Sequence, residues 1–343
     1  MQNRWYVPLM AVALAASSGT LAQNVKITPL GSHAGELCAR DRATIFEDPT
    51  GVRILYDPGH SVLGSDDARL GRIDAVILSH AHGDHIGDQK LKVLEGGTCD
   101  APQVISATPQ STTADIAAAK NAAVIMVNPL ASFIARKIET IRGKPTATCP
   151  QTGNDIVLPL AAPCVAGGVQ TGGARGVKAK DAAKSVEVIV VPAMHDSTVP
   201  AGLLSESARK SLEPDNASLV LGPPVGYVIR FTNGLTAYLS GDTGMLAEMR
   251  SVVHDFYHAN LMQLNYGSSA LSAQAAAYVV DTLVQPNAVI LSHVNEGATS
   301  GGKVRAGTRS AELVSLSKQR PIYPALSGKT MEFDGNGKCV AGC

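Results

Sequence analysis

One short segment of the chain gathers residue types that bind divalent metal ions. It reads Ser79-His80-Ala81-His82-Gly83-Asp84-His85. Neutral imidazole nitrogens and carboxylate oxygens are the ligands that Zn²⁺ and similar ions take in proteins. Alternate residues of an extended segment point to the same side, so His80 and His82 can grip one ion. Asp84 and His85 are offset from that pair and can face a second ion. The segment therefore predicts a metal site.

Three further polar residues share one context, because each lies just beyond an apolar run. His195 follows the apolar run at 186–191, Asp242 follows the run at 236–240, and His293 follows the run at 289–292. Strand ends along one edge of a sheet are where an α/β fold builds its site. Two ions need more ligands than one loop offers, so we expect these three residues to join the loop.

The elements that must position these residues are short apolar strands that alternate with helical patterns. Strands are expected at 43–46, 52–56, 75–79, 104–107, 186–191, 228–231, 236–240, 261–264 and 289–292, and the turn residues Asp48-Pro49-Thr50-Gly51 make a hairpin of the first two. Apolar residues at helical spacing predict helices at 112–120, 245–253, 273–284 and 310–317, and a helix-like run at 86–94. This alternation predicts an α/β fold.

One stretch breaks the rhythm of strands and helices. Residues 143–185 are rich in Gly, Ala, Pro and Lys and show little periodicity. We interpret them as an insertion or long loop within a single domain that covers residues 23–343.

The order of the candidate ligands resembles that of the metallo-β-lactamase superfamily, a family of metal-dependent hydrolases. The match runs through the loop motif and then His195, Asp242 and His293, so it spans most of the chain. The resemblance implies an αββα sandwich of two similar halves, with two metal ions at one edge where the sheets meet. It assigns His80, His82 and His195 to the first ion, and Asp84, His85 and His293 to the second. Asp242 would bridge both ions, and Asp57 is similar to the family's early aspartate, which orients the ligand loop.

Individual residues of the motif indicate which branches of the superfamily the chain resembles most. True β-lactamases of the superfamily have a cysteine at the position of Asp242 or lack the bridging aspartate, which makes β-lactam hydrolysis the alternative reading. An intact His82 disfavours the flavin-linked di-iron branch, which has a glutamate there. The early Thr28-Pro29-Leu30-Gly31-Ser32 and the aspartate bridge look more like the ribonuclease Z, lactonase and phosphodiesterase branches.

The chemistry implied is hydrolysis. Two adjacent divalent ions lower the pKa of a shared water toward ~7, which supplies a bridging hydroxide for attack on an ester, lactone or phosphodiester. Asp84 is placed to hold that water and move its proton. Zn²⁺ is the default ion, and Mn²⁺ or Fe²⁺ suit the same ligands. Asn265 and Tyr266 follow a strand and could donate to a substrate oxygen, although a capped strand end explains them equally well. A metal-binding protein of the same fold without hydrolytic activity stays open as a further alternative.

Composition limits the partners. Lys and Arg number 29 and Asp and Glu also number 29, with only 4% aromatic residues. Nucleic-acid binding normally needs a basic excess or aromatic stacking surfaces, so we expect a small-molecule substrate and no nucleic acid. The sequence makes no prediction of the oligomeric state.

The first 22 residues have the layout of a secretory signal peptide. Arg4 precedes an uncharged run at 7–16, and small residues at Thr20 and Ala22 predict cleavage before Gln23. The run is about half of the ~20 residues that a membrane-spanning helix needs, so we expect no stable membrane anchor and a periplasmic or secreted protein. An even number of cysteines, six, then suggests disulfides. The nearest pairs are Cys149 with Cys164 and Cys339 with Cys343, although the second closes a very small loop that strain could forbid.

The remaining polar residues near these motifs are ambiguous from sequence. His60, Asp196, Asn295 and Glu296 adjoin the candidate ligands and fit either a site or a structural role. His33, His254 and His258 have no partner pattern and are expected on the surface.

Overall fold

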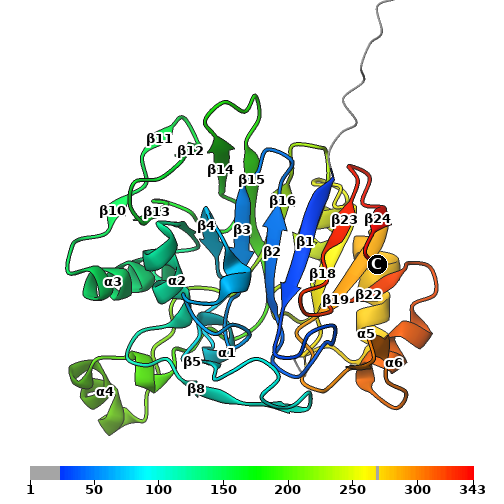
Figure 1. Cartoon of the computed structure of the whole chain (residues 1–343), viewed down its shortest axis with the longest axis horizontal. Helices are drawn as coiled ribbons and strands as arrows, with labels where there is room; N and C mark the ends of the chain where they lie inside the picture. The colour runs from blue at the N-terminus through cyan, green and yellow to red at the C-terminus, as the bar shows by residue number, and fades with distance from the viewer. Residues whose placement is uncertain (1–23, 268–269) are drawn as a thin grey trace, which may run out of the picture.

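Two large sheets form the body of the molecule in the computed structural model, which describes residues 24–267 and 270–343 (Figure 1). The first sheet has the spatial order β10 (Ala147–Thr148), β13 (Cys164–Val165), β9 (Ala123–Ile125), β4 (Ala75–Ile77), β3 (Arg53–Tyr56), β2 (Ala43–Glu47), β1 (Val25–Leu30), β23 (Met331–Phe333), β24 (Cys339–Ala341). The second has the order β11 (Gln151–Thr152), β12 (Asp155–Leu158), β14 (Ala174–Ala179), β15 (Val186–Pro192), β16 (Val225–Arg230), β17 (Thr236–Leu239), β18 (Leu261–Asn265), β19 (Ala288–Ser292), β22 (Ile322–Pro324). Three two-stranded ribbons pair β5 (Gln89–Leu91) with β8 (Val104–Ser106), β6 (Gly97–Thr98) with β7 (Ala101–Pro102), and β20 (Thr299–Ser300) with β21 (Lys303–Val304).

Helices cover the outer faces of the two sheets, as the left and right sides of Figure 1 show. The helices are α1 (Gly83–Ile86), α2 (Thr112–Lys120), α3 (Leu130–Arg142), α4 (Glu206–Leu212), α5 (Ala273–Tyr278) and α6 (Arg309–Leu316). α5 continues as a π-helical segment, Val279–Val284. α4 buries none of its residues and protrudes at the lower left of Figure 1.

Side-chain alternation explains why both faces of the first sheet are covered. In β3, Ile54 and Tyr56 join the core between the sheets, whereas Leu55 packs on the other face with the helical layer. Successive residues of a strand point to opposite faces, so a strand that is apolar at every position needs partners on both sides. The result is four layers, helix–sheet–sheet–helix, which confirms the predicted αββα sandwich.

Several expected elements are confirmed and others need correction. β2 and β3 pair as the predicted hairpin, with the Asp48 amide donating to the Val52 carbonyl across the turn at 2.9 Å. The run at 86–94 is not a helix, because Gly87 adopts φ 81° and ends α1, and β5 follows. The stretch at 245–253 is helical only from Met249, as a π-helical turn. Helix α3 is not among the helices expected from the sequence.

The segment at 143–185 is not one long loop. It contains five short strands, β10 to β14, which extend the edges of both sheets. Three of them are two residues long, too short for a strand to show its alternation in the sequence.

Three disulfides tie the chain together: Cys38–Cys99, Cys149–Cys164 and Cys339–Cys343. Both local pairs expected from sequence are therefore present, including the one that closes a small loop. The predicted signal peptide at residues 1–22 lies outside the described residues. Among the residues that the structure does describe, no helix is both long and apolar enough to cross a membrane.

Candidate metal centre

The candidate ligands meet at one edge of the sandwich because the strands before them run in compatible directions. β3, β4 and β9 are parallel, and so are β17, β18 and β19. β15 and β17 are both antiparallel to β16, so their carboxyl ends share an edge. His195, Asp242 and His293 leave this edge of the second sheet, and the ligand loop leaves the matching edge of the first. Tyr227 donates to the Leu78 carbonyl at 2.8 Å and fixes the two sheets together here.

Asp57 holds the ligand loop in place. It is fully buried after β3, and its carboxylate accepts from the Ser79 amide at 2.8 Å and the Ser79 hydroxyl at 2.7 Å. The same carboxylate lies 2.7 Å from Nδ1 of His85. The bond fixes the imidazole ring and leaves Nε2 facing the other candidate ligands. Asp57 thus occupies the position predicted for an orienting residue.

Gly59 permits the close approach of this segment to the ligand loop. Its φ is 42°, and a Cβ there would collide with the Asp84 carbonyl oxygen. Its amide donates to the His85 carbonyl at 3.0 Å. A side chain at this position would push the loop away from Asp57.

All seven candidate ligands come together in three overlapping clusters. The clusters are His80–His82–His195, His80–His85–Asp242 and Asp84–His85–His293, each with its ligand atoms within 4.8 Å of one another. The first cluster is the more open, since the side chains of His82 and His195 are 28% and 22% exposed. The last contains two buried imidazoles, His85 at 0% and His293 at 1%, and the more accessible carboxylate of Asp84, at 34%.

Asp242 lies between the open and buried sides. Its Oδ1 is 3.4 Å from His85 Nε2, while its Oδ2 is 3.4 Å from His293 Nε2 and 3.8 Å from His195 Nε2. One carboxylate therefore faces ring nitrogens from both sides, which is the placement that bridging two ions requires.

The donor atoms fit a divalent ion. Nδ1 of His80 contacts the Ser79 hydroxyl at 2.9 Å, whereas its buried Nε2 has no hydrogen-bond partner among residues 24–267 and 270–343. Nε2 of His85 and Nε2 of His293 lie 3.0 Å apart. A buried polar nitrogen is rarely left without a partner, and the unpartnered Nε2 of His80 fits coordination to a divalent ion.

Burial and neighbouring charges set the protonation of the cluster without metal. Burial and the charge of His85 hold the pKa of His80 well below its ordinary value, and burial lowers the pKa of His195. Burial opposes a charge on His85, yet Asp242, Asp57 and Asp84 together raise its pKa to about 10. Burial would likewise raise the pKa of Asp84 and Asp242, but nearby cationic side chains hold both pKa values well below the usual range. The cluster is thus a set of ionised carboxylates that attract cations.

Arg42 also contacts the centre, although the motif did not predict it. It is 2% exposed and forms an ion pair with Oδ2 of Asp84. Nothing in its local sequence marks it, because it lies just before β2 and meets Asp84 only after the sheets assemble. Arg42 positions the Asp84 carboxylate at the buried side of the centre.

The predicted substrate-contact residues take other positions. Asn265 is 1% exposed, and its amide donates to Asp242 Oδ1 at 3.2 Å, so it orients that carboxylate. Tyr266 is also buried, with the Arg309 guanidinium 4.6 Å above its ring centroid. Both contacts favour the structural interpretation of this pair.

The residues left ambiguous by the sequence separate into different roles. Asp196 faces His82 Nε2 at 3.1 Å, and His60 pairs with Asp88 at 2.7 Å. The Asn295 amide donates to the Gly267 carbonyl at 2.9 Å. Glu296 accepts from two amides at the start of α6 and is a helix-capping residue. Asp196 is thus the one of these four that contacts a candidate ligand.

Comparison with known proteins agrees with this geometry. The model of the metallo-β-lactamase superfamily matches residues 43–90, which include Asp57 and the ligand loop. A UPF0173 metal-dependent hydrolase of Polynucleobacter asymbioticus is 24% identical over 337 residues, which are 95% of each chain. One from Opitutus terrae is 23% identical over 284 residues, 82% of this chain and 92% of its own.

A solved structure shares the fold over almost the whole chain. The metallo hydrolase from the hyperthermophilic archaeon Ignicoccus hospitalis superposes with a TM-score of 0.53 at 19% identity, covering 91% of this chain and 99% of its own. With the ligand loop inside the matched segment and the two-sheet fold around it, this chain is similar to the metal-dependent hydrolases of the metallo-β-lactamase superfamily.

Proposed function

We propose that this protein is an exported hydrolase with two divalent metal ions, which cleaves an ester, lactone or phosphodiester bond in a small-molecule substrate. The observation that carries the proposal is the set of overlapping His and Asp clusters with Asp242 between them. The metal-dependent hydrolases among the relatives support the same reaction class. We assign the open side to His80, His82 and His195 and the buried side to Asp84, His85 and His293.

When bound, two adjacent divalent ions supply Lewis acidity and a water that ionises near neutral pH. Side chains of the protein accept the proton and hold the ligands in place. Asp84 is ionised, 34% exposed and held by Arg42, so it can accept a proton from water at the mouth of the centre. Asp57 and Asn265 keep His85 and Asp242 in fixed orientations. Fixed ligands need little reorganisation during the reaction, which is how a site gains rate from electrostatics.

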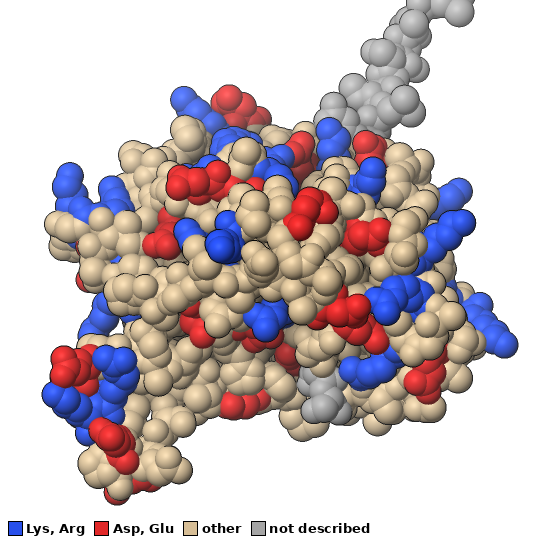
Figure 2. Space-filling view, turned by 60° about the horizontal axis from the view of Figure 1, so that its bottom comes forward, with Lys and Arg blue, Asp and Glu red and all other residues tan. Residues whose placement is uncertain are grey.

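The carboxylate of Asp242 favours ester, lactone or phosphodiester cleavage over β-lactam hydrolysis, as the sequence motif suggests. A small substrate also suits the surface. On the face shown in Figure 2, Lys and Arg are interspersed with Asp and Glu, and no large single-sign patch gathers there. Nucleic-acid binding by the phosphate backbone relies on such a basic patch.

Metal content and turnover test this proposal together. Protein loaded with Zn²⁺, and separately with Mn²⁺ or Fe²⁺, would be analysed for bound metal and assayed on a nitrophenyl phosphodiester, an acyl-homoserine lactone and a chromogenic cephalosporin. We expect two ions per chain and turnover of one of the first two substrates. Turnover of the cephalosporin alone would support the β-lactam alternative, and two ions without any turnover would support a non-hydrolytic metal-binding protein.

Export is proposed from the signal-peptide pattern and fits the three disulfides, which persist in oxidising compartments. The mature chain would then begin at Gln23 as a single domain. Intact mass of protein recovered from the periplasm or medium tests this, and a chain that retains residues 1–22 would contradict it.

A further inference from the structure

A cavity beside the candidate metal centre is lined by a basic side chain, Arg40, that the reaction described above does not use. Its volume is about 390 Å³, and its lining includes Arg40, Arg42, His60, Asp84, Asp88 and Asn295. Asp84 belongs to both the cavity and the metal centre, so a group bound in the cavity lies next to the reacting bond.

The acidic side chains in this cavity already have partners. Asp84 pairs with Arg42, and Asp88 pairs with His60 at 2.7 Å. Arg40 is different, because its guanidinium donates to the neutral amide oxygen of Gln89 at 3.2 Å. Within the described part of the chain, no carboxylate lies within ion-pair distance of Arg40. One exposed positive charge at the cavity therefore has no negative partner.

The backbone of Arg40 is held in an unfavourable conformation. Its φ is 71°, in the left-handed region that favours glycine. Two donors fix its carbonyl oxygen: Nε of Arg42 at 3.0 Å and the Ser61 hydroxyl at 2.8 Å. A non-glycine residue with positive φ costs about 1 kcal/mol or more and persists only where the surroundings enforce it, which is common at functional sites.

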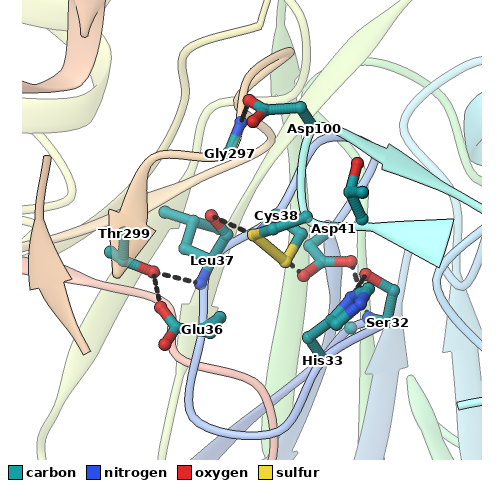
Figure 3. The surroundings of a disulfide bond; sticks show 12 residues. Ser32, His33, Glu36, Leu37, Cys38, Asp41, Asp100, Gly297 and Thr299 are labelled. Carbon is teal, nitrogen blue, oxygen red and sulfur yellow. Dashed lines mark hydrogen bonds between the residues drawn. A yellow bond between two sulfur atoms is a disulfide. The ribbon is translucent and has the colours of Figure 1, made fainter. Parts of the chain in front are cut away.

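A disulfide and its neighbours anchor the same turn. Cys38 is bonded to Cys99, and its amide donates to the Asp41 carboxylate at 3.0 Å, as Figure 3 shows. The Asp41 carboxylate also accepts from the Ser32 amide at 2.8 Å. The Asp41 carbonyl accepts from the His293 amide at 3.1 Å. The turn that carries Arg40 is therefore fixed relative to a candidate ligand, so the backbone from which the Arg40 side chain extends has a defined position beside the metal centre.

We propose that Arg40 binds an anionic group of the substrate, a carboxylate or a phosphate, in this cavity while the scissile bond lies at the metal centre. Guanidinium groups form strong charge-assisted hydrogen bonds with both kinds of anion. The assignment rests on the proposed hydrolytic function and adds the substrate class to it. It makes Arg40 a specificity-determining residue and not a metal ligand.

A pair of esters that differ only in charge tests the assignment. The mono-4-nitrophenyl ester of glutaric acid carries a free carboxylate, and the corresponding ester of glutaramic acid is neutral. Because a hydrogen bond to a charged group is worth roughly 1.5–3 kcal/mol, we expect at least a tenfold preference of wild type for the anionic ester in kcat/KM. Arg40→Gln should abolish that preference through KM and leave the neutral ester unaffected, while Arg40→Lys should retain part of it.

A matched control removes the same charge elsewhere. Arg136 is exposed on α3, so Arg136→Gln should leave the preference unchanged. An equal loss for both esters in Arg40→Gln, or no loss for either, would overturn the assignment.

Direct binding separates this proposal from the hydrolytic one. Calorimetric titration of glutarate, and separately of inorganic phosphate, into metal-loaded protein should give about tenfold weaker binding for Arg40→Gln than for wild type at equal metal content. The anion that binds more tightly indicates whether the charged group of the substrate is a carboxylate or a phosphate. If wild type hydrolyses no substrate but this binding difference remains, the hydrolytic function fails and the anion site stands. If both anions bind Arg40→Gln as they bind wild type, the anion site is contradicted whatever the activity.

Discussion

The two sides of the candidate metal centre are built differently. On the buried side, His85 and His293 are almost inaccessible, Asp57 holds one ring and Arg42 holds Asp84. On the open side, the side chains of His82 and His195 are about a quarter exposed, and Asp196, which faces His82, is 56% exposed. Each side thus contains an imidazole beside a carboxylate. The pair of His85 and Asp57 is buried in the protein, whereas the pair of His82 and Asp196 is exposed to solvent.

This difference separates the enclosed imidazoles and their partners, which stabilise the fold, from the solvent-accessible groups of the centre, which include Asp84 at 34% exposed. A buried charge without its partner is expensive, so the buried side must stay fully paired to remain folded. An exposed pair is screened by water and contributes little to stability. The open side can therefore change partners during a reaction without endangering the fold.

Asp57→Asn should have the largest effect on stability. The substitution removes the carboxylate charge that faces His85 Nδ1. It also replaces one of the two carboxylate oxygens, which together accept from the Ser79 amide and hydroxyl and contact His85, with an NH₂ group that cannot accept. We expect a loss of about 3 kcal/mol in the free energy of unfolding and a fall in metal content. Denaturant unfolding and elemental analysis measure both, and wild-type stability in this variant would refute the role of Asp57.

Asp84→Asn should come next, with its main effect on turnover. The side chain keeps its shape but loses its charge and its capacity to accept a proton, and Arg42 is left without its ion-pair partner. We expect kcat to fall by about 100-fold or more and stability by about 2 kcal/mol. Retention of wild-type kcat would show that Asp84 does not move the proton.

Metal uptake should depend on pH differently at the two sides. In the metal-free protein the pKa of His85 is raised to about 10, so an ion must displace its proton at neutral pH. Affinity at the buried side should then rise by about tenfold per pH unit from pH 7 to 9. On the open side, burial lowers the pKa of His80 and His195, so both are neutral at pH 7 and affinity should be nearly flat above that pH. Calorimetry across this range should resolve two steps with different slopes, and equal slopes would contradict the comparison.

Asp196→Asn should have the smallest effect and is the matched control for Asp57→Asn. Its carboxylate also faces an imidazole, but it is mostly exposed. We expect less than about 1 kcal/mol of destabilisation and unchanged metal content. A loss as large as that of Asp57→Asn would remove the distinction between the buried and open sides.

The features that could be predicted from the sequence are those defined by residues close together in the chain. The His80–His85 loop and the hairpin of β2 and β3 could be predicted because neighbouring residues define them. His195, Asp242 and His293 could be predicted because each lies just beyond an apolar strand. The strands within 143–185 could not, since they are too short to show a period and depend on pairing with distant strands.

The sequence alone determined the kinds of donor atom, their order along the chain and the α/β fold class, because apolar alternation and motif spacing are properties of neighbouring residues, whereas the layered sandwich was implied by the family resemblance. The tertiary structure alone decided that Arg42 meets Asp84, that Asn265 faces Asp242, and that Arg40 reaches the cavity beside the neutral amide of Gln89. These contacts join strands and loops far apart in the chain, and only the packing of the two sheets brings them within hydrogen-bond distance.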